Sequence, residues 1–175
     1  QGLDIVIDVA LDLNSDSMIQ FVIAGEGAAK EKLLKMAKSY RLNNIRFLPV
    51  QPLEKLPELL AAADVHLVIQ KSEAADLVMP SKLTNILAAG RPALATADQG
   101  TALYEVINNY KIGMTSSPGN MADLIEKIKK LSVNHQERKQ MGINAREYAE
   151  KYLDKDSILK EFERNLLSLV NNKDK

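Results

Sequence analysis

The segment 80–92 combines residue types that suit the binding of a phosphate group. Ser81 is of a type that caps helices and Gly90 of a type that ends them, so we expect a helix between them. The N-terminus of a helix presents free backbone N–H groups and a partial positive charge, to which Lys82 adds a full charge. Asn85 follows one turn later on the face of Lys82, where its amide can bond a sugar hydroxyl. An ordinary capped helix with a solvated lysine fits these residues equally well.

A second candidate is the segment Gly25-Glu26-Gly27, which follows a strand pattern and precedes a helical one. Glycines in such a place let a phosphate or the backbone of a ligand approach closely. The segment lacks the third glycine of a dinucleotide fingerprint and the Gly-Lys-Ser/Thr of a P-loop. A plain turn and a ligand contact are therefore both consistent with it.

The remaining polar residues give weaker signals. His66 lies within an apolar strand pattern, where a histidine is more often a hydrogen-bonded core residue than a catalyst. The chain has two His and no Cys, so we expect neither a metal site nor a cysteine nucleophile. Glu73 and Asp76 are the acids close to the candidate helix, and a surface role is the default for both.

The composition is that of an ordinary folded domain. The chain has 175 residues, 46% of them hydrophobic, and its 23 basic and 23 acidic side chains balance. This length predicts one domain spanning 1–175, and the charge balance argues against a nucleic-acid partner. The longest apolar runs are far shorter than the ~20 residues that span a bilayer. Because the first residue is Gln, we expect a fragment of a longer chain.

Strand and helix patterns alternate along the first two thirds of the chain, which predicts right-handed βαβ units and a parallel sheet with helices on both faces. From residue 122 onward the pattern is helical only. In an open sheet of this kind, ligands bind at the carboxyl ends of the strands. The expected strands are 21–24, 45–48, 65–69, 92–96 and 111–114, and the loops to inspect are 25–28, 49–53, 70–82 and 97–101.

The segment 3–13 fits two structures. Its apolar residues alternate, which favours a strand, whereas Asp4, Asp8 and Asp12 form a polar stripe at helical spacing. Like charges four residues apart cost a helix only a few tenths of a kcal/mol each, which is too little to decide.

Several segments, taken in order, resemble the C-terminal, donor-binding domain of a family 4 (group 1) glycosyltransferase of the GT-B fold. The resemblance centres on 84–96, which matches that family's Leu-Glu-Ala-Met-Ala-x-Gly-x-Pro-Val-Val-Ala-Thr. Pro-Ser-Lys at 80–82, with 75–79 before it, resembles a subgroup that builds bacterial capsule, colanic-acid or O-antigen sugars. The other matching segments are 21–27, 45–49, 60–65 and 149–170.

The resemblance implies a Rossmann-like parallel sheet with extra C-terminal helices, and a retaining transfer of sugar from a nucleotide-diphosphate donor to an acceptor hydroxyl. The developing charge on the leaving diphosphate then needs preset hydrogen-bond donors. The helix start at Ser81 and Lys82, with the N–H groups of Val78 and Met79, is the candidate for that role. No metal or other cofactor is implied, since the helix dipole and the lysine can carry the charge.

Further roles follow from the same resemblance. Asn85 would hold the ribose, the backbone of Pro49, Val50 and Gln51 would line the base pocket, and Gly25 and Gly27 would leave room at the interdomain cleft.

This sequence departs from the family's signature of two glutamates with seven residues between them. The second glutamate falls on Asn85, which keeps the hydrogen bonds but not the charge, and the first falls on Leu77. Asp76, next to Leu77, is the candidate to contact the donor sugar and, with Lys82, to act in catalysis.

The resemblance also predicts what surrounds the chain. The family's diphosphate-binding Arg and Lys, and the strand that carries them, would precede Gln1, and 3–13 would be a helix. The acceptor would bind an N-terminal domain of the same protein, so we expect no turnover from the chain alone. A cytoplasmic location is implied, and a lipid-linked acceptor would place the enzyme at the inner face of the membrane.

Two other functions remain open. A nucleotide-sugar epimerase of related fold would need an acid and a base in the cleft, and the sequence offers no convincing pair. A flavodoxin-like binding or regulatory domain of the receiver type would need clustered acids at the strand ends, which the first strands lack.

Overall fold

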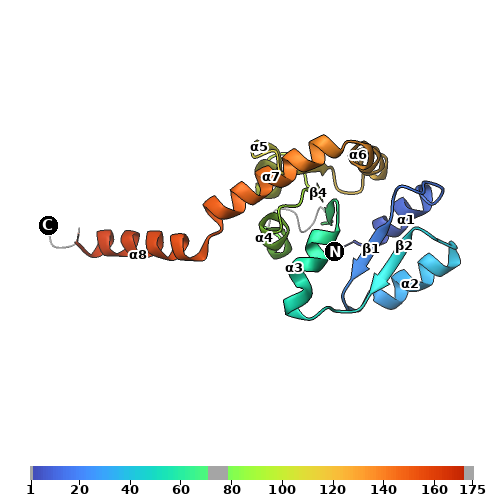
Figure 1. Ribbon diagram of the computed structural model, residues 1–175, viewed down its shortest axis with the longest axis horizontal. Coiled ribbons are helices and arrows are strands. Elements are labelled where there is room, and N and C mark those ends of the chain that lie inside the picture. Colours follow the sequence, from blue (N-terminus) through green and yellow to red (C-terminus); the bar gives the residue numbers. More distant parts are fainter. Residues whose placement is uncertain (1, 71–78, 172–175) are drawn as a thin grey trace.

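Strands and helices alternate along the chain before three helices close it (Figure 1). The computed structural model describes residues 2–70 and 79–171. The elements are α1 Asp4–Asp12, β1 Phe21–Ala24, α2 Lys30–Ser39, β2 Ile45–Leu48, η1 Leu53–Lys55, α3 Leu56–Ala62, β3 His66–Val68, α4 Ser81–Ala88, β4 Ala93–Thr96, α5 Ala102–Asn109, β5 Gly113–Ser116, α6 Met121–Val133, α7 His135–Tyr152 and α8 Lys155–Asn171.

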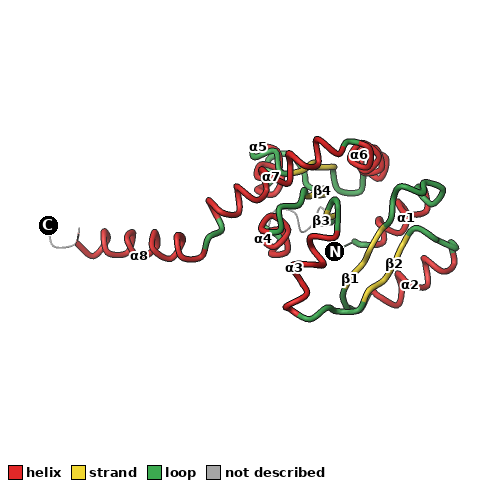
Figure 2. Tube along the Cα trace, in the orientation of Figure 1, coloured by secondary structure: helices red, strands yellow, loops and turns green. Residues whose placement is uncertain are grey.

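All strand pairs among the described residues are parallel, as the alternation predicts, but they form two groups (Figure 2). One group is the pair β1–β2, and the other has the order β3-β4-β5. Strand β4 is central in its group and buried at every position, which is typical of a parallel strand covered on both faces. The predicted class, a parallel sheet with helices on both faces, is confirmed.

Successive residues of β4 face opposite layers of the core, as the period of a strand requires. Leu94 packs with the buried faces of α1 and α6, and with Phe21 of β1. Ala93 and Ala95 pack on the other side with α4, α5 and the Ala145 region of α7. The small side chains of β4 let these helices lie close to the strand, which fixes the position of α4.

Segment 3–13 is helical over α1, as the family resemblance predicts and against its alternating pattern. The helix buries Val6, Ile7 and Val9. Its apolar face therefore contributes side chains to both core clusters that contact β1 and β2. Asp4 lies on the opposite side and forms an ion pair with Lys32 of α2 at 2.8 Å. Burial of this apolar face therefore selects the helix over the strand, which the spacing of apolar residues in 3–13 does not decide.

Strand β5 begins two residues later than the sequence pattern predicts. Lys111 has a positive φ of 51° and ends the turn after α5, where the Ile112 N–H donates to the Ile107 carbonyl at 3.1 Å. A residue in this left-handed conformation cannot start a strand. Gly113 then lies beside Ala93 in the ladder.

Helix α8 extends away from the rest of the structure in Figure 1. Its apolar side chains are largely exposed, and examples are Ile158, Phe162 and Leu167 at 48%, 60% and 56% of their full surface. No other described element covers these side chains. The stability of the domain therefore rests on the elements before α8.

Candidate functional site

The loops after β1 and β2 meet at one edge of their sheet. The two strands are parallel, and the Gly25 N–H donates to the Leu48 carbonyl at 3.1 Å. Gly25 has a φ of +132°, a conformation that favours glycine, and a Cβ built there or at Gly27 would meet no atom within 4 Å. The two glycines thus combine a special backbone with open space beside it, as a ligand contact requires.

Residues 49–51 lie next to this glycine loop, since β2 ends at Leu48. Val50 is 63% exposed, and the Gln51 side-chain amide donates to the Pro49 carbonyl at 3.0 Å. The hydrogen bond holds the loop in a defined turn while the apolar side chain of Val50 faces solvent. Such a loop offers backbone polar groups and a small apolar surface to a planar ring.

Helix α4 begins differently from the prediction. Pro80, with an extended ψ of 120°, occupies the N-cap position, and Ser81 is the first helical residue, so the expected cap by Ser81 is wrong. Among the described residues no side chain caps this helix, whereas Thr101 caps α5 and Asn120 caps α6. Within residues 2–70 and 79–171, the backbone N–H groups at the start of α4 therefore have no side-chain acceptor, as is also the case for α1, α2 and α3, and such groups can bind an anion.

Lys82 lies in the first turn of α4 and is half-buried. Burial lowers the pKa of its ammonium group from the usual 10.5, because the charged form loses hydration. Leu83 and Ile86 anchor the helix in the core, and the exposed Asn85 lies one turn beyond Lys82 on the outer side. The predicted placement of Lys82 and Asn85 on neighbouring positions of one helix is confirmed.

Two residues with roles implied by the family resemblance, and the position on which the family's first glutamate falls, belong to the segment between β3 and α4. Asp76, Leu77 and Val78 lie outside the described residues. Met79 is described, half-buried and packed against the core cluster that contains Val68 of β3 and Leu83 of α4. The start of α4 is thus tied to β3 by an apolar contact directly before Pro80.

A threonine that the sequence analysis missed joins the ends of β3 and β4. The Gln70 N–H donates to Thr96 Oγ1 at 2.7 Å, and the Thr96 hydroxyl donates to the Gln70 carbonyl at 2.8 Å. Thr96 is 1% exposed, so these two bonds are shielded from water. They fix the chain where it leaves β3 toward α4. In the sequence, the only sign of this contact is that the apolar run 93–96 ends in a polar residue.

Replacing Thr96 by valine is expected to lower the free energy of unfolding by about 2 kcal/mol, because the N–H and the carbonyl of the half-buried Gln70 both lose their bond to the hydroxyl at nearly constant side-chain volume. Urea unfolding followed by circular dichroism measures the change. The matched control is Thr84→Val, since the Thr84 hydroxyl bonds the Ser81 carbonyl at an exposed position. Equal losses in the two variants would contradict the role of Thr96.

His66 is held by the fold and does not face the site. Its Nε2–H donates to the Leu60 carbonyl at 2.9 Å, and burial lowers its pKa. It lies at the start of β3, the end opposite to α4. In the described ranges 2–70 and 79–171, no group of three or more His, Asp or Glu side chains could hold a metal ion.

The structure therefore places the predicted site residues in two groups at carboxyl ends of strands. Gly25, Gly27 and the loop 49–51 follow β1 and β2, while Ser81, Lys82 and Asn85 follow β3. Parallel strands that alternate with helices, with these loops at their ends, define a Rossmann-like domain, and the start of α4 beside Lys82 is its candidate anion site.

Comparison with known proteins gives the family. Residues 1–148 match the family model "Glycosyl transferases group 1", and the chain belongs to this family. A putative colanic acid biosynthesis glycosyl transferase, WcaI of Escherichia coli K12, is 41% identical over 165 residues, which are 93% of this chain and 39% of that protein. The probable glycosyltransferase WbjE of Pseudomonas aeruginosa is 28% identical over 77% of this chain and 34% of its own. The chain thus spans between a third and two fifths of the length of these curated relatives.

Solved structures share the fold. HepE of Anabaena, crystallised with UDP-glucose, superposes with a TM-score of 0.76 at 21% identity over 95% of this chain and 45% of its own. Sucrose-phosphate synthase of Thermosynechococcus elongatus superposes with a TM-score of 0.78 at 16% identity over 98% of this chain and 43% of its own. The expected family and its fold are confirmed. None of the described helices is long and apolar enough to cross a membrane.

Proposed function

We propose that the chain is the donor-binding domain of a retaining glycosyltransferase, which transfers a hexosyl group from a nucleotide-diphosphate sugar to an acceptor hydroxyl. The observation that carries this proposal is the start of α4, the helix that follows β3, where backbone N–H groups that no described side chain caps adjoin Lys82. Membership of the group 1 glycosyl transferases supports it.

The start of α4 has the chemistry that departure of a diphosphate needs. Negative charge grows on the leaving diphosphate as the bond to the sugar breaks, and preset N–H donors and a cation stabilise that charge without reorganisation. Ser81 and Lys82 supply such groups on a helix whose apolar face is fixed in the core. The N–H groups of Val78 and Met79 extend this set in the proposal, and Asp76 contacts the donor sugar.

The nucleoside would bind the other residues. Asn85, exposed one turn into α4, can both donate to and accept from the ribose hydroxyls. The loop Pro49–Gln51 would contact the base through its backbone, and Gly25 and Gly27 leave space for the diphosphate sugar. The UDP-glucose complex of HepE, which shares the fold, supports a uridine nucleotide as the first ligand to test.

The relative WcaI, named as a putative glycosyl transferase of colanic acid biosynthesis, supports a proposal for the biological role. We propose that this chain serves the synthesis of a bacterial surface polysaccharide, with an N-terminal domain of the same protein binding a glycan or lipid-linked acceptor at the inner face of the membrane. In this proposal the chain alone binds the donor but does not turn it over.

Calorimetric titration with UDP, GDP, ADP and inorganic phosphate tests the proposed function. A nucleoside diphosphate is expected to bind at least about tenfold more tightly than phosphate, because the ribose and base add contacts to those of the phosphoryl groups. Equal affinity for all four compounds, or no heat with any of them, would refute a nucleotide-sugar site and favour a non-catalytic domain.

The affinity for UDP is expected to fall as the pH rises through the pKa of Lys82, which burial holds below 10.5. The diphosphate favours the charged ammonium, so binding takes up a proton at a pH between the pKa of the free protein and that of the complex. Titrations between about pH 7.5 and 10 in buffers of different ionisation heat measure both effects.

The control is Lys82→Arg, because guanidinium stays charged throughout this range. In that variant the fall in affinity and the proton uptake should shrink to what UDP itself contributes. An unchanged pH profile in Lys82→Arg would show that another group is responsible.

A further inference from the structure

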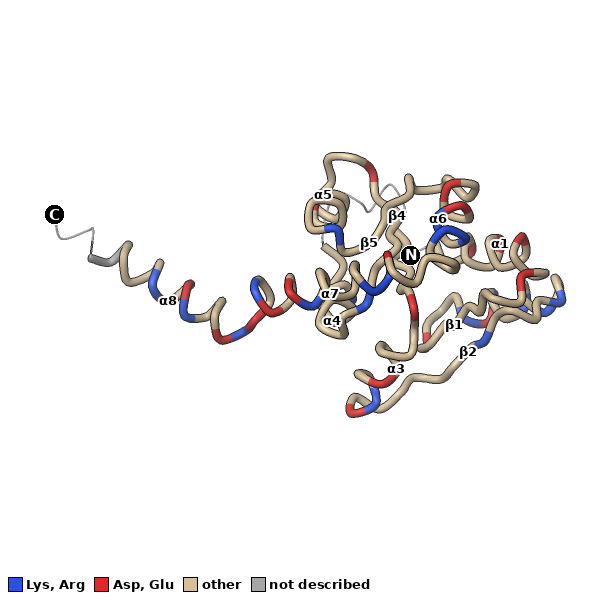
Figure 3. Tube along the Cα trace, turned by 45° about the horizontal axis from the view of Figure 1, so that its top comes forward, with Lys and Arg blue, Asp and Glu red and all other residues tan. Residues whose placement is uncertain are grey.

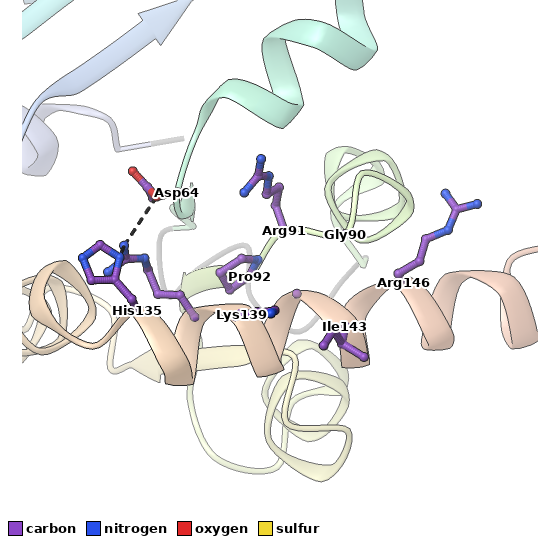
Figure 4. A pocket seen from close by; sticks show the side chains of 10 residues that line it. Asp64, Gly90, Arg91, Pro92, His135, Lys139, Ile143 and Arg146 are labelled. Carbon is purple, nitrogen blue, oxygen red and sulfur yellow. Dashed lines mark hydrogen bonds and ion pairs between the residues drawn. The ribbon is translucent and has the colours of Figure 1, made fainter.

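A hollow in the structure lies at the amino ends of β3 and β4, beyond the C-terminal end of α4. Asp64 precedes β3, the segment 90–92 precedes β4, and α7 closes the hollow from one side (Figure 4). Its volume is about 450 Å³, which is in the range of pockets for small molecules. Because β3 and β4 are parallel, this pocket and the proposed donor site lie at opposite edges of one sheet.

The lining of this pocket is strongly basic. Arg91, Arg138, Lys139 and Arg146 line it with the carboxylate of Asp64. Arg146 is also ion-paired with Glu150 at 2.7 Å, so four cations face two carboxylates. Figure 3 shows that basic residues lie along α7 where this helix passes beside α4. Pro92 and Ile143 are the chief apolar side chains of the lining. A pocket with this excess of cations suits a small anion with several oxygen atoms and does not suit an apolar molecule.

Backbone carbonyls near the ends of three helices hold the guanidinium groups in place. Arg91 donates to the Ala61 carbonyl of α3, Arg138 to the Leu131 carbonyl of α6, and Arg146 to the Ala88 carbonyl of α4. A guanidinium has five N–H donors, and the bonds that Arg91 and Arg146 make to the protein leave some of these for a ligand. Their positions are therefore set before any anion arrives.

The backbone around the pocket is tightly packed. A Cβ at Gly142 of α7 would lie 2.5 Å from the Gly90 carbonyl oxygen, so helix and turn are in direct contact there. Arg138 is 8% exposed, and it also donates to the Ser132 carbonyl at 3.0 Å and to Asp64 at 3.5 Å. Sites on such rigid elements hold their geometry better than sites on loops.

We propose that the basic pocket formed by Asp64, Arg91, Arg138, Lys139 and Arg146 binds a phosphoryl group, carried either by a free phosphate compound or by an anionic lipid headgroup. This ligand is separate from the donor nucleotide, and the two sites can be filled together. The proposal does not depend on the proposed function, because it rests on the pocket alone.

Titration with inorganic phosphate, followed by amide NMR shifts of the protein, tests the pocket. The amides of Gly90 and Gly142 report on it directly, and their shifts should saturate with saturating UDP present. Lys139→Glu, a change at an exposed residue, should weaken phosphate binding at these amides by about tenfold or more. Lys129→Glu is the matched control, because it changes the net charge equally on the exposed surface of α6.

The control variant should bind phosphate within about twofold of the unmodified protein, since exposed charges at a distance are screened. No saturable shift of Gly90 and Gly142, or equal weakening by Lys139→Glu and Lys129→Glu, would overturn the proposal. Loss of these shifts when UDP is added would overturn the claim that the two sites can be filled together, because UDP and phosphate would then compete for one site.

Sedimentation with vesicles distinguishes the two sources of the phosphoryl group. Vesicles of phosphatidylglycerol and of phosphatidylcholine are compared, with the unmodified protein and with Lys139→Glu. Binding to phosphatidylglycerol that Lys139→Glu abolishes supports a lipid headgroup as the ligand. Saturable binding of free phosphate without vesicle binding supports a soluble phosphate compound.

Discussion

Lys82→Ala is expected to weaken the binding of UDP by about 30-fold and to leave the binding of uridine nearly unchanged. A charge-assisted hydrogen bond contributes about 1.5–3 kcal/mol, and the proposed partner of Lys82 is the diphosphate, which uridine lacks. Calorimetric titration of the protein with both compounds measures the two effects. The half-buried position of Lys82 strengthens the expectation, because a partly dehydrated ammonium gains more from an anion than a solvated one.

The comparison of UDP with uridine separates a lost contact from a damaged fold. A variant with a disturbed site would lose affinity for both compounds in proportion. Lys129→Ala on the exposed surface of α6 removes the same charge and should leave both affinities within about twofold. A 30-fold loss for uridine, or no loss for UDP, would contradict the proposed role of Lys82.

Gly113→Ala is expected to destabilise the fold by about 3–5 kcal/mol, which is near the upper end of single-residue effects. A Cβ on Gly113 would lie 1.8 Å from the Ala93 carbonyl oxygen and 2.8 Å from its carbonyl carbon. Both partners of this clash are backbone atoms of paired strands, so no side chain can move to relieve it. Strand β5 must shift away from β4, which breaks their ladder. Chemical unfolding monitored by circular dichroism measures the loss.

Thr115→Ala provides the control for Gly113→Ala within the same strand. It removes side-chain atoms without adding any, and Thr115 is half-buried, so a loss below about 1 kcal/mol is expected. If Gly113→Ala were as stable as the unmodified chain, the close pairing of β4 with β5 would be incorrect.

The sequence predicts the order of helices and strands well, because local residue types indicate most of them. Apolar runs such as 21–24 and 45–48 are strands as expected. The beginning of β5 was misplaced because the left-handed conformation of Lys111 has no signal in a lysine side chain. The nature of 3–13 needed the family resemblance, because only tertiary burial of Val6 and Val9 favours the helix.

The candidate site could be predicted where its residues belong to one segment. It could not be predicted where residues from distant segments come into contact. Lys82 and Asn85 lie three residues apart on α4, so the helical period was enough to place them together. The two hydrogen bonds between Gln70 and Thr96 join residues that are 26 positions apart. The basic pocket is lined by residues that lie between 64 and 146 in the sequence. Such contacts depend on the packing of whole elements, which short-range patterns do not specify.

The division of the strands into two groups has a consequence for the chain in solution. Among the described residues, β1 pairs with β2 on one side only, and β3 pairs with β4 on one side only. In the part of the chain that the structure describes, side-chain packing, and not backbone hydrogen bonding, therefore joins the two groups, since Phe21 of β1 and Leu94 of β4 belong to one core cluster. In solution the position of β1 relative to β4 thus depends on this shared core.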